Sequence, residues 1–330
     1  MSSPSDRKLF LNLSNRIEIL AAELGRVLKA EVSDPMKPQQ VMVHSAVTAR
    51  WLAMELAEHN GISMGVEYTF PRIVIDEMLE KVVPEVTASP HFTSESMTWW
   101  IFQHVPDYLT KPEFAEVSEY LKSGDDVRRY QLAGKAAWLL HQYQLYRPDM
   151  LRDWESANTG DHWQQTLWRE MRRQYKGEHS FIDQLQMVHQ LSEEAIRDAG
   201  LPERLSIFGL NTLTPAYLKI LWKISTTTQI DLYLLAPTDQ YWGDLTTRKK
   251  STRFLNEEDL SQGNPLLGSW GTLSRDLINQ LVDLDFQQRF EYFETPSSAT
   301  MISCIQRDLQ NLEDRTGTEI REKVPDGDVS

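Results

Sequence analysis

The feature that most constrains the fold is an alternation of strand and helix patterns that stops near residue 88 and resumes near residue 195. Each strand pattern is a short apolar run, and the segments between the runs carry apolar residues every three or four positions. The runs lie at residues 9–13, 41–45, 65–70, 205–210 and 230–236. Because such alternation favours a parallel sheet with crossover helices, the sequence predicts an α/β fold.

The stretch between the two alternating regions has helical periodicity only, as at Leu132, Ala136, Leu140 and Tyr143. We therefore predict one α/β domain interrupted by a helical insertion. Its parts are residues 1–88, the insertion at 89–194, and the return to the α/β domain at 195–330. Within the last part we expect a polar loop over much of 238–275, a helix over 273–284 and a mobile acidic tail.

The junction between the first strand and its helix lacks a phosphate-binding loop. A mononucleotide-binding fold would place GxxxxGK[ST] there, whereas residues 13–16 read Leu-Ser-Asn-Arg. The strand after the helical stretch is where a P-loop helicase carries the acid that coordinates Mg²⁺. Phe208 stands at that position, and a phenyl ring cannot bind Mg²⁺. Both halves of a nucleotide site are missing, and periodicity alone also allows an unrelated α/β fold.

Composition excludes several other classes of protein. GxSxG, HExxH and CxxC motifs are absent, the eight histidines show no metal-ligand spacing, and Cys304 is the single cysteine. No apolar run reaches the roughly 18 residues of a membrane span. The formal net charge of −14 argues against a surface coated with nucleic acid, although it leaves room for a local basic groove.

Longer motifs carry a resemblance to a known family. They are "SNRIEIL" (14–20), "ARWLAMELAEHNGI" (49–62), "QLAGKAA" (131–137), "QYQLYRPDMLRDWE" (142–155), "YWGDL" (241–245) and "GNPLLGSWGTLSRD" (263–276). In this order and at this spacing they resemble the N-terminal part of the RecC family, the gamma subunits of exodeoxyribonuclease V. The resemblance implies a P-loop-helicase-like parallel sheet with an inactivated nucleotide site and an all-helical insertion. The resemblance implies that residues 13–16 correspond to a phosphate-binding loop that has lost its binding residues and is retained for its structural role.

The resemblance also implies a role. Members of the family are several-fold longer, so the chain is expected to be a truncated fragment of a non-catalytic DNA-binding subunit. The chain itself is expected to have no activity and no cofactor, because ATP and Mg²⁺ belong to the partner subunits of the RecBCD helicase–nuclease. The implied partners are RecB-like and RecD-like subunits and single-stranded or forked DNA, in the bacterial cytoplasm and without a membrane. The whole subunit would split the duplex and scan the 3′ strand for the recombination hotspot Chi.

The family's strand-scanning surface corresponds to three places in this sequence. The first gives His44, Ala46 and Arg50, and the second gives Phe70 and Asp76. The third is one helix and the residue that follows it, with Trp138, Leu139, His141, Gln142 and Arg147. Several of these side chains differ in charge or size from the family pattern, so the cognate hotspot is not readable from the sequence.

The residues of the third place support a single-strand interface independently. Lys135, Trp138 and His141 lie off the apolar stripe of their helix, and a ring beside a cation suits base stacking. The alternative is that Trp138 packs against another tryptophan of the insertion.

Other residues allow a structural interpretation. Arg169, Arg172, Arg173 and Lys176 form a basic stripe that either contacts phosphates or is a solvated helix face. The tryptophans of the family motifs are interpreted as structural. They are Trp51, Trp154, Trp242 and Trp270.

Two other functions stay open. An active subunit of the related AddAB type would need a lysine-bearing loop or an iron–sulfur cysteine set, which the sequence lacks. A structural interaction module without DNA contact fits the net charge.

Overall fold

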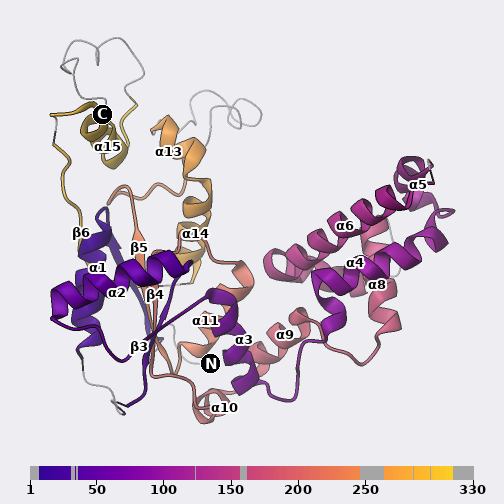
Figure 1. The fold of residues 1–330 in the computed structure, drawn as a ribbon, viewed down its shortest axis with the longest axis horizontal. Coiled ribbons are helices and arrows are strands. Elements are labelled where there is room, and N and C mark those ends of the chain that lie inside the picture. The colour runs from indigo at the N-terminus through magenta and orange to yellow at the C-terminus, as the bar shows by residue number, and fades with distance from the viewer. Residues whose placement is uncertain are drawn as a thin grey trace. The chain divides into compact units, whose positions relative to one another are not determined.

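The structure is a computed structural model that describes residues 7–30, 34, 36–122, 124–156, 162–245, 264–284, 286–297 and 299–314. The chain forms two compact units. The sheet unit comprises residues 1–74, 201–213 and 224–330, and the helical unit comprises 75–200 and 214–223 (Figure 1). The domain limits drawn from periodicity, at 88 and 194, stay a prediction. The predicted mobile tail lies, from residue 315 onward, outside the described residues.

The sheet unit is built on a six-stranded sheet of order β3-β2-β4-β5-β1-β6. Its strands are β1 (Leu9–Ser14), β2 (Gln39–Met42), β3 (Val66–Thr69), β4 (Arg204–Phe208), β5 (Gln229–Leu235) and β6 (Gln287–Tyr292). Every neighbouring pair is parallel, which confirms the predicted α/β fold class. Because β2 pairs with β4, one sheet combines strands from both sides of the long helical stretch.

The helices divide between the two units. The sheet unit holds α1 (Ile17–Leu28), α2 (Ala46–Asn60), α13 (Pro265–Trp270), α14 (Thr272–Asp283) and α15 (Met301–Gln310), and α3 (Pro71–Val82) begins there. The helical unit holds α4 (Ser94–His104), α5 (Ala115–Leu121), α6 (Asp126–Tyr146), α7 (Pro148–Ser156), α8 (Trp163–Gln174), α9 (Phe181–Gln190), α10 (Glu193–Asp198) and most of α11 (Pro215–Ile224). Short 3₁₀ turns lie at Pro90–Phe92, Val105–Tyr108 and Pro112–Phe114.

Two strands end more than one residue earlier than their apolar runs predict. β2 stops at Met42 because Ser45 caps α2, its Oγ accepting a hydrogen bond from the Thr48 amide at 3.1 Å. β4 stops at Phe208 because Gly209 adopts φ +66°, a left-handed conformation that glycine tolerates.

Periodicity missed β6 and α15 altogether. β6 is an edge strand whose side chains are exposed except for the half-buried Phe290, so it carries no apolar alternation.

Helices α1 and α2 cover one face of the sheet (Figure 1). Leu20 and Leu24 of α1 and Leu52 of α2 pack there against Phe208 and Tyr233, all fully buried. β5 is buried along nearly its whole length, as expected of a central parallel strand.

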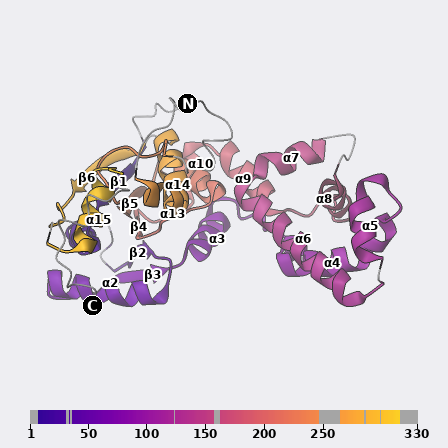
Figure 2. The ribbon, with the colours of Figure 1, turned by 90° about the horizontal axis from the view of Figure 1, so that it is seen from above.

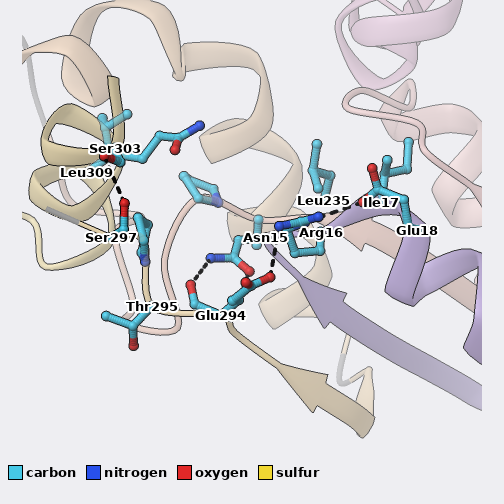
Figure 3. Close-up of a pocket in the computed structure, with 14 residues that line it drawn as sticks. Asn15, Arg16, Ile17, Glu18, Leu235, Glu294, Thr295, Ser297, Ser303 and Leu309 are labelled. Atoms are coloured by element: carbon cyan, nitrogen blue, oxygen red, sulfur yellow. Dashed lines mark hydrogen bonds and ion pairs between the residues drawn. The ribbon is translucent and has the colours of Figure 1, made fainter. Parts of the chain in front are cut away.

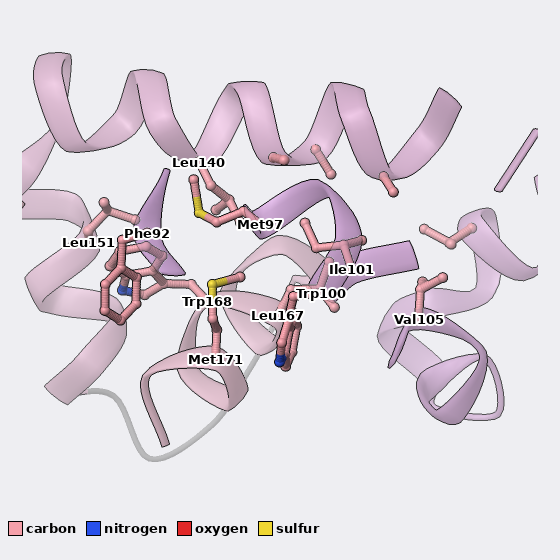
Figure 4. Close-up of a cluster of buried hydrophobic side chains, with 14 of the residues drawn as sticks. Phe92, Met97, Trp100, Ile101, Val105, Leu140, Leu151, Leu167, Trp168 and Met171 are labelled. Atoms are coloured by element: carbon pink, nitrogen blue, oxygen red, sulfur yellow. The ribbon is translucent and has the colours of Figure 1, made fainter. Parts of the chain in front are cut away.

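The helical unit has its own core between α4, α6, α7 and α8, which lie together in Figure 2. The buried alanines of α6, at 133, 136 and 137, let α4 approach closely. Trp168 of α8 lies fully buried in this core (Figure 4). Its Nε1 donates to Glu155 at 3.0 Å. A large aromatic with its polar atom paired is a stable core anchor.

Candidate nucleic-acid interface

The turn between β1 and α1 lies at the carboxyl edge of the sheet, where parallel α/β folds bind ligands. It lines an open cavity of about 680 Å³ together with the residues after β5 and the linker from β6 to α15 (Figure 3). The Asn15 side chain donates to the Glu294 carbonyl at 2.7 Å and accepts from the Glu294 amide at 3.0 Å. Arg16 Nη1 pairs with the Glu294 carboxylate at 2.8 Å. We call these three interactions the Asn15–Glu294 clasp.

The electrostatics of this cavity do not suit a nucleotide. Arg16 also approaches Glu18, at 3.4 Å, so its guanidinium lies between two carboxylates of the lining. A triphosphate would meet those carboxylates and a cation that they already neutralise.

The carboxyl end of β4 is equally unsuited to Mg²⁺. Phe208 is the last residue of the strand and is fully buried, with its ring 6.2 Å from Trp51 and 6.0 Å from Tyr233 between centroids. Among the described residues, no group of three or more His, Cys, Asp or Glu side chains could hold a metal ion.

One buried acid does lie in the centre of the sheet. Asp231 of β5 is fully buried and pairs with Arg289 of β6, Oδ1 to Nη1, at 2.7 Å. Burial raises the pKa of this carboxyl, whereas the hydrogen bond from Gln229 and the charge of Arg289 oppose the rise. The guanidinium carbon of Arg289 stacks 3.6 Å from the ring centroid of Phe10. The pair therefore joins β5 to β6 across β1, and its role is structural.

The third predicted place forms an exposed face on α6. Ala133, Ala136 and Leu140 point into the core, and the opposite side of the helix carries Lys135 and Trp138. Trp138 is 47% exposed, and Lys135 Nζ lies 4.4 Å from its ring centroid. Trp138 is therefore not part of the core of the helical unit.

The other residues predicted for this place lie on the last part of α6 or directly after it. Leu139, His141 and Gln142 are half-buried, and Arg147 is exposed directly after the helix. We call Lys135, Trp138, Gln142 and Arg147 the α6 face. A ring, a cation and an amide side by side can stack a base, hold a phosphate and hydrogen-bond a base edge.

The first two predicted places come together in the sheet unit. β2 and β3 are parallel neighbours, and the Val43 amide donates to the Thr69 carbonyl at 2.9 Å. His44 and Phe70, which follow these strand ends, therefore leave the same edge of the sheet. Both side chains are exposed.

Helices that begin at this edge carry the rest of the predicted residues. Ala46 and Arg50 are exposed one turn apart in α2, and His44 Nδ1 lies 3.2 Å from the Thr48 hydroxyl. Asp76 is exposed on α3, in the part that belongs to the helical unit. That the sheet-unit residues and the α6 face share one groove stays a prediction.

Comparisons with known proteins bear on the whole chain. A family model described as "RecC, N-terminal domain" matches residues 9–312. The chain belongs to the RecC family.

Curated relatives agree with this assignment. The RecBCD enzyme subunit RecC of Escherichia coli K12 is 30% identical, in an alignment covering 94% of this chain and 31% of the relative. That of Haemophilus influenzae is 27% identical over 82% of this chain and 30% of the relative, and that of Mycolicibacterium smegmatis is 29% identical over 91% and 28%. The chain thus spans less than a third of the length of these RecC proteins.

The motifs that carry the RecC resemblance do not all contribute core residues. Trp242 is buried, and Trp51 and Trp154 are partly buried against the cores of their units. Trp270 is 89% exposed, so its interpretation as a structural anchor is wrong. In α13, Leu267 enters the local core with Trp242. Trp270, the last residue of the helix, stays exposed.

The basic stripe of this RecC-family chain divides into two kinds of residue. Arg172 pairs with Glu155 at 2.9 Å and with Asp183 at 3.0 Å, and Arg173 hydrogen-bonds Glu170. Burial raises the pKa of Glu155, and the charge of Arg172 opposes it. In the part of the chain that the structure describes, Arg169 and Lys176 have no ion pair of their own. They line a cavity of about 500 Å³ in the helical unit.

Sequence reasoning missed two features of this RecC domain. The Asn15–Glu294 clasp joins residues far apart in the chain, so no local signal predicts it. Trp99 of α4 is 51% exposed, and here a signal existed, because Trp100 and Ile101 already supply the inward face of that turn. Within the described residues, no helix is both long and apolar enough to cross a membrane.

Proposed function

We propose that this chain is a non-catalytic part of a RecBCD-type DNA-processing complex and binds single-stranded DNA through the α6 face. The observation that carries the proposal is Trp138, an exposed ring beneath the Lys135 ammonium, in a chain of the RecC family. Stacking on such a ring needs no particular base sequence. The relatives are named as subunits of the RecBCD enzyme, which supports RecB-like and RecD-like partners and a place in recombinational DNA repair.

The finer role follows from the same proposal. The chain would help to form the tunnel for the unwound 3′ strand and to scan it for a Chi-like hotspot, in the cytoplasm of a bacterium. His44, Arg50 and Phe70 would contribute contacts from the sheet unit, and the amide of Gln142 suits a base edge.

DNA binding by the chain tests the proposal. We expect a fluorescein-labelled oligothymidylate to bind the full 330-residue chain weakly, and Trp138→Ala to weaken binding by about 1–3 kcal/mol. Trp270→Ala is the matched control, because it removes a more exposed tryptophan from the sheet unit. Equal affinities for the unaltered chain and the Trp138 variant across a salt series, with both folded, would contradict the proposal. Equal affinities would instead support a structural interaction module, an alternative that fits the net charge of −14.

Nucleotide binding tests the non-catalytic part of the proposal. We expect a labelled ATP analogue with Mg²⁺ to show no saturable binding, because Glu18 and Glu294 place carboxylates in the lining of this cavity and a buried phenyl ring, Phe208, ends β4 where a metal ligand would be needed. Isothermal titration or equilibrium dialysis measures this directly. Micromolar affinity for the analogue would overturn this part of the proposal.

A further inference from the structure

The helical unit carries a second group of exposed aromatic rings, on α4 and the first half of α6. Trp99 is 51% exposed and Tyr130 is 47% exposed, with ring centroids 5.5 Å apart. Phe102 completes the group at 6.0 Å from Trp99 and 6.2 Å from Tyr130. We call Trp99, Phe102 and Tyr130 the aromatic platform.

The core of the unit does not require the exposed rings of the platform. On α4, Trp100 and Ile101 are the residues that enter the core, at 4% and 0% exposure. Trp99 therefore projects from the side of α4 that faces away from them. Half-exposed rings that touch one another leave their outer surfaces open to a flat partner.

A cationic side chain lies close to a ring in the platform, as one does in the α6 face. The Arg129 guanidinium carbon lies 4.2 Å from the Phe102 ring centroid, and Arg129 also pairs with Asp126 at 2.9 Å. Lys135 stands over Trp138 two turns away on the same helix. Aromatic rings combined with cations are the composition of single-strand binding surfaces.

One ring of the platform, Tyr130, lies on the same helix as the α6 face. Tyr130 and Trp138 are eight residues apart in α6, which corresponds to about 12 Å along the helix axis. Gly134 stands midway and lies against Thr98 of α4, where an added Cβ would be 4.0 Å from the Thr98 methyl. No side chain at position 134 therefore stands between the two exposed rings.

We propose that the aromatic platform is a second base-stacking position for single-stranded DNA, so that one strand passes from Trp138 to Tyr130 and Trp99. This inference rests on the proposed function and extends it to residues outside the three predicted places. The ligand class is unpaired nucleobases, bound by ring stacking without sequence preference. A protein partner is the other occupant that exposed rings could have. We favour DNA because the platform continues the α6 face and shares its pairing of rings with cations.

Ring-removing variants of the full chain test the platform. We expect Trp99→Leu and Tyr130→Leu each to weaken oligothymidylate binding by about tenfold, which lies in the range for one lost stacking contact. The slope of log affinity against log salt should not change, because that slope counts phosphate contacts and not rings. Trp99→Phe keeps a ring and should retain most of the affinity. Tyr120→Leu is the matched control, since Tyr120 of α5 is 46% exposed and outside the platform.

The outcomes separate this inference from the proposed function. Affinity unchanged in both platform variants, while Trp138→Ala weakens binding, would overturn the platform and leave the α6 face in place. A chain that binds no strand at any salt concentration would overturn both. Circular dichroism and thermal unfolding check that each variant is folded, and Tyr130→Leu with Trp99→Phe decide the matter if Trp99→Leu does not fold. Loss of binding to a protein partner with unchanged DNA affinity would also overturn the platform.

Discussion

Asp231 and Arg289 form a residue pair that links two strands of the sheet. The carboxylate is fully buried, and the guanidinium side chain is 32% exposed. A buried carboxylate without its cation is costly, whereas the intact pair is close to neutral for stability. The pair therefore links the polar edge strand β6 to β5, and destabilisation is expected only when one partner is removed.

The residue-scale prediction follows from this pair. We expect Arg289→Met to lower the free energy of unfolding by about 2 kcal/mol at neutral pH, because Asp231 stays buried without its cation. Burial raises the folded pKa of Asp231, so stability is present below the unfolded pKa and is lost as pH rises through the folded pKa. Removing Arg289 raises that pKa further. Urea unfolding should therefore show a larger loss at about pH 8 than at about pH 5.

The control for this prediction removes the negative charge of Asp231 in addition to the positive charge of Arg289. In the Arg289→Met background, Asp231→Asn should restore most of the stability and abolish the pH dependence. A loss that is the same at both pH values would contradict the account.

The β1–α1 turn shows what one element contributes to the fold. A turn at this edge of a parallel sheet is suited to phosphate binding, since the helix N-terminus points toward the ligand position. Here Arg16 at the N-cap makes no side-chain cap, and the Ser14 hydroxyl accepts the Arg16 amide at 3.1 Å. The Asn15 side chain forms hydrogen bonds with the backbone amide and carbonyl of Glu294. The turn now fastens the linker between β6 and α15.

At the element scale, we expect Asn15→Ala to loosen that linker. The substitution removes two hydrogen bonds to Glu294 at an exposed site, so the free energy of unfolding should fall by only about 1 kcal/mol. Hydrogen exchange of the Glu294 amide should become faster, because its acceptor is lost. Thr295→Ala lines the same cavity and should leave the exchange unchanged. Equal exchange in both variants would show that the clasp does not hold the linker.

For the whole molecule, the sheet unit and the helical unit each carry part of the predicted DNA surface. His44, Arg50 and Phe70 belong to the first unit, and the α6 face belongs to the second. Each part alone offers few contacts, and the chain carries a net charge of −14. Weak binding by the isolated chain is the expected consequence.

At the scale of the whole molecule, we expect one strand to contact both units. A single strand containing a photoreactive thymidine analogue should cross-link to peptides from residues 43–51 and from α6, as mapped by mass spectrometry. Arg50→Ala should reduce the salt dependence if Arg50 holds a phosphate, or change base preference if it contacts a base edge. Cross-links confined to α6, with Arg50→Ala unchanged in both measurements, would contradict this prediction.

The sequence by itself determined the fold class, and it predicted the lack of a phosphate-loop motif and an outward face on α6. Each depends on local information: the strand patterns identify β1 to β5, and helical spacing separates Trp138 from Leu140. The lack of a phosphate-loop motif is likewise read from a few neighbouring residues, 13–16, and the lack of a metal-binding acid from Phe208 alone.

Only the tertiary structure decided which distant segments meet. β6 has no apolar alternation, yet it pairs with β1 and brings Arg289 to Asp231 of β5. The Asn15–Glu294 clasp joins residues 279 positions apart, and the aromatic platform forms only because α4 packs on α6 at Gly134. Side-chain periodicity reports which face of an element is buried. It does not report what packs against that face, because pairing between distant segments depends on the folded chain as a whole.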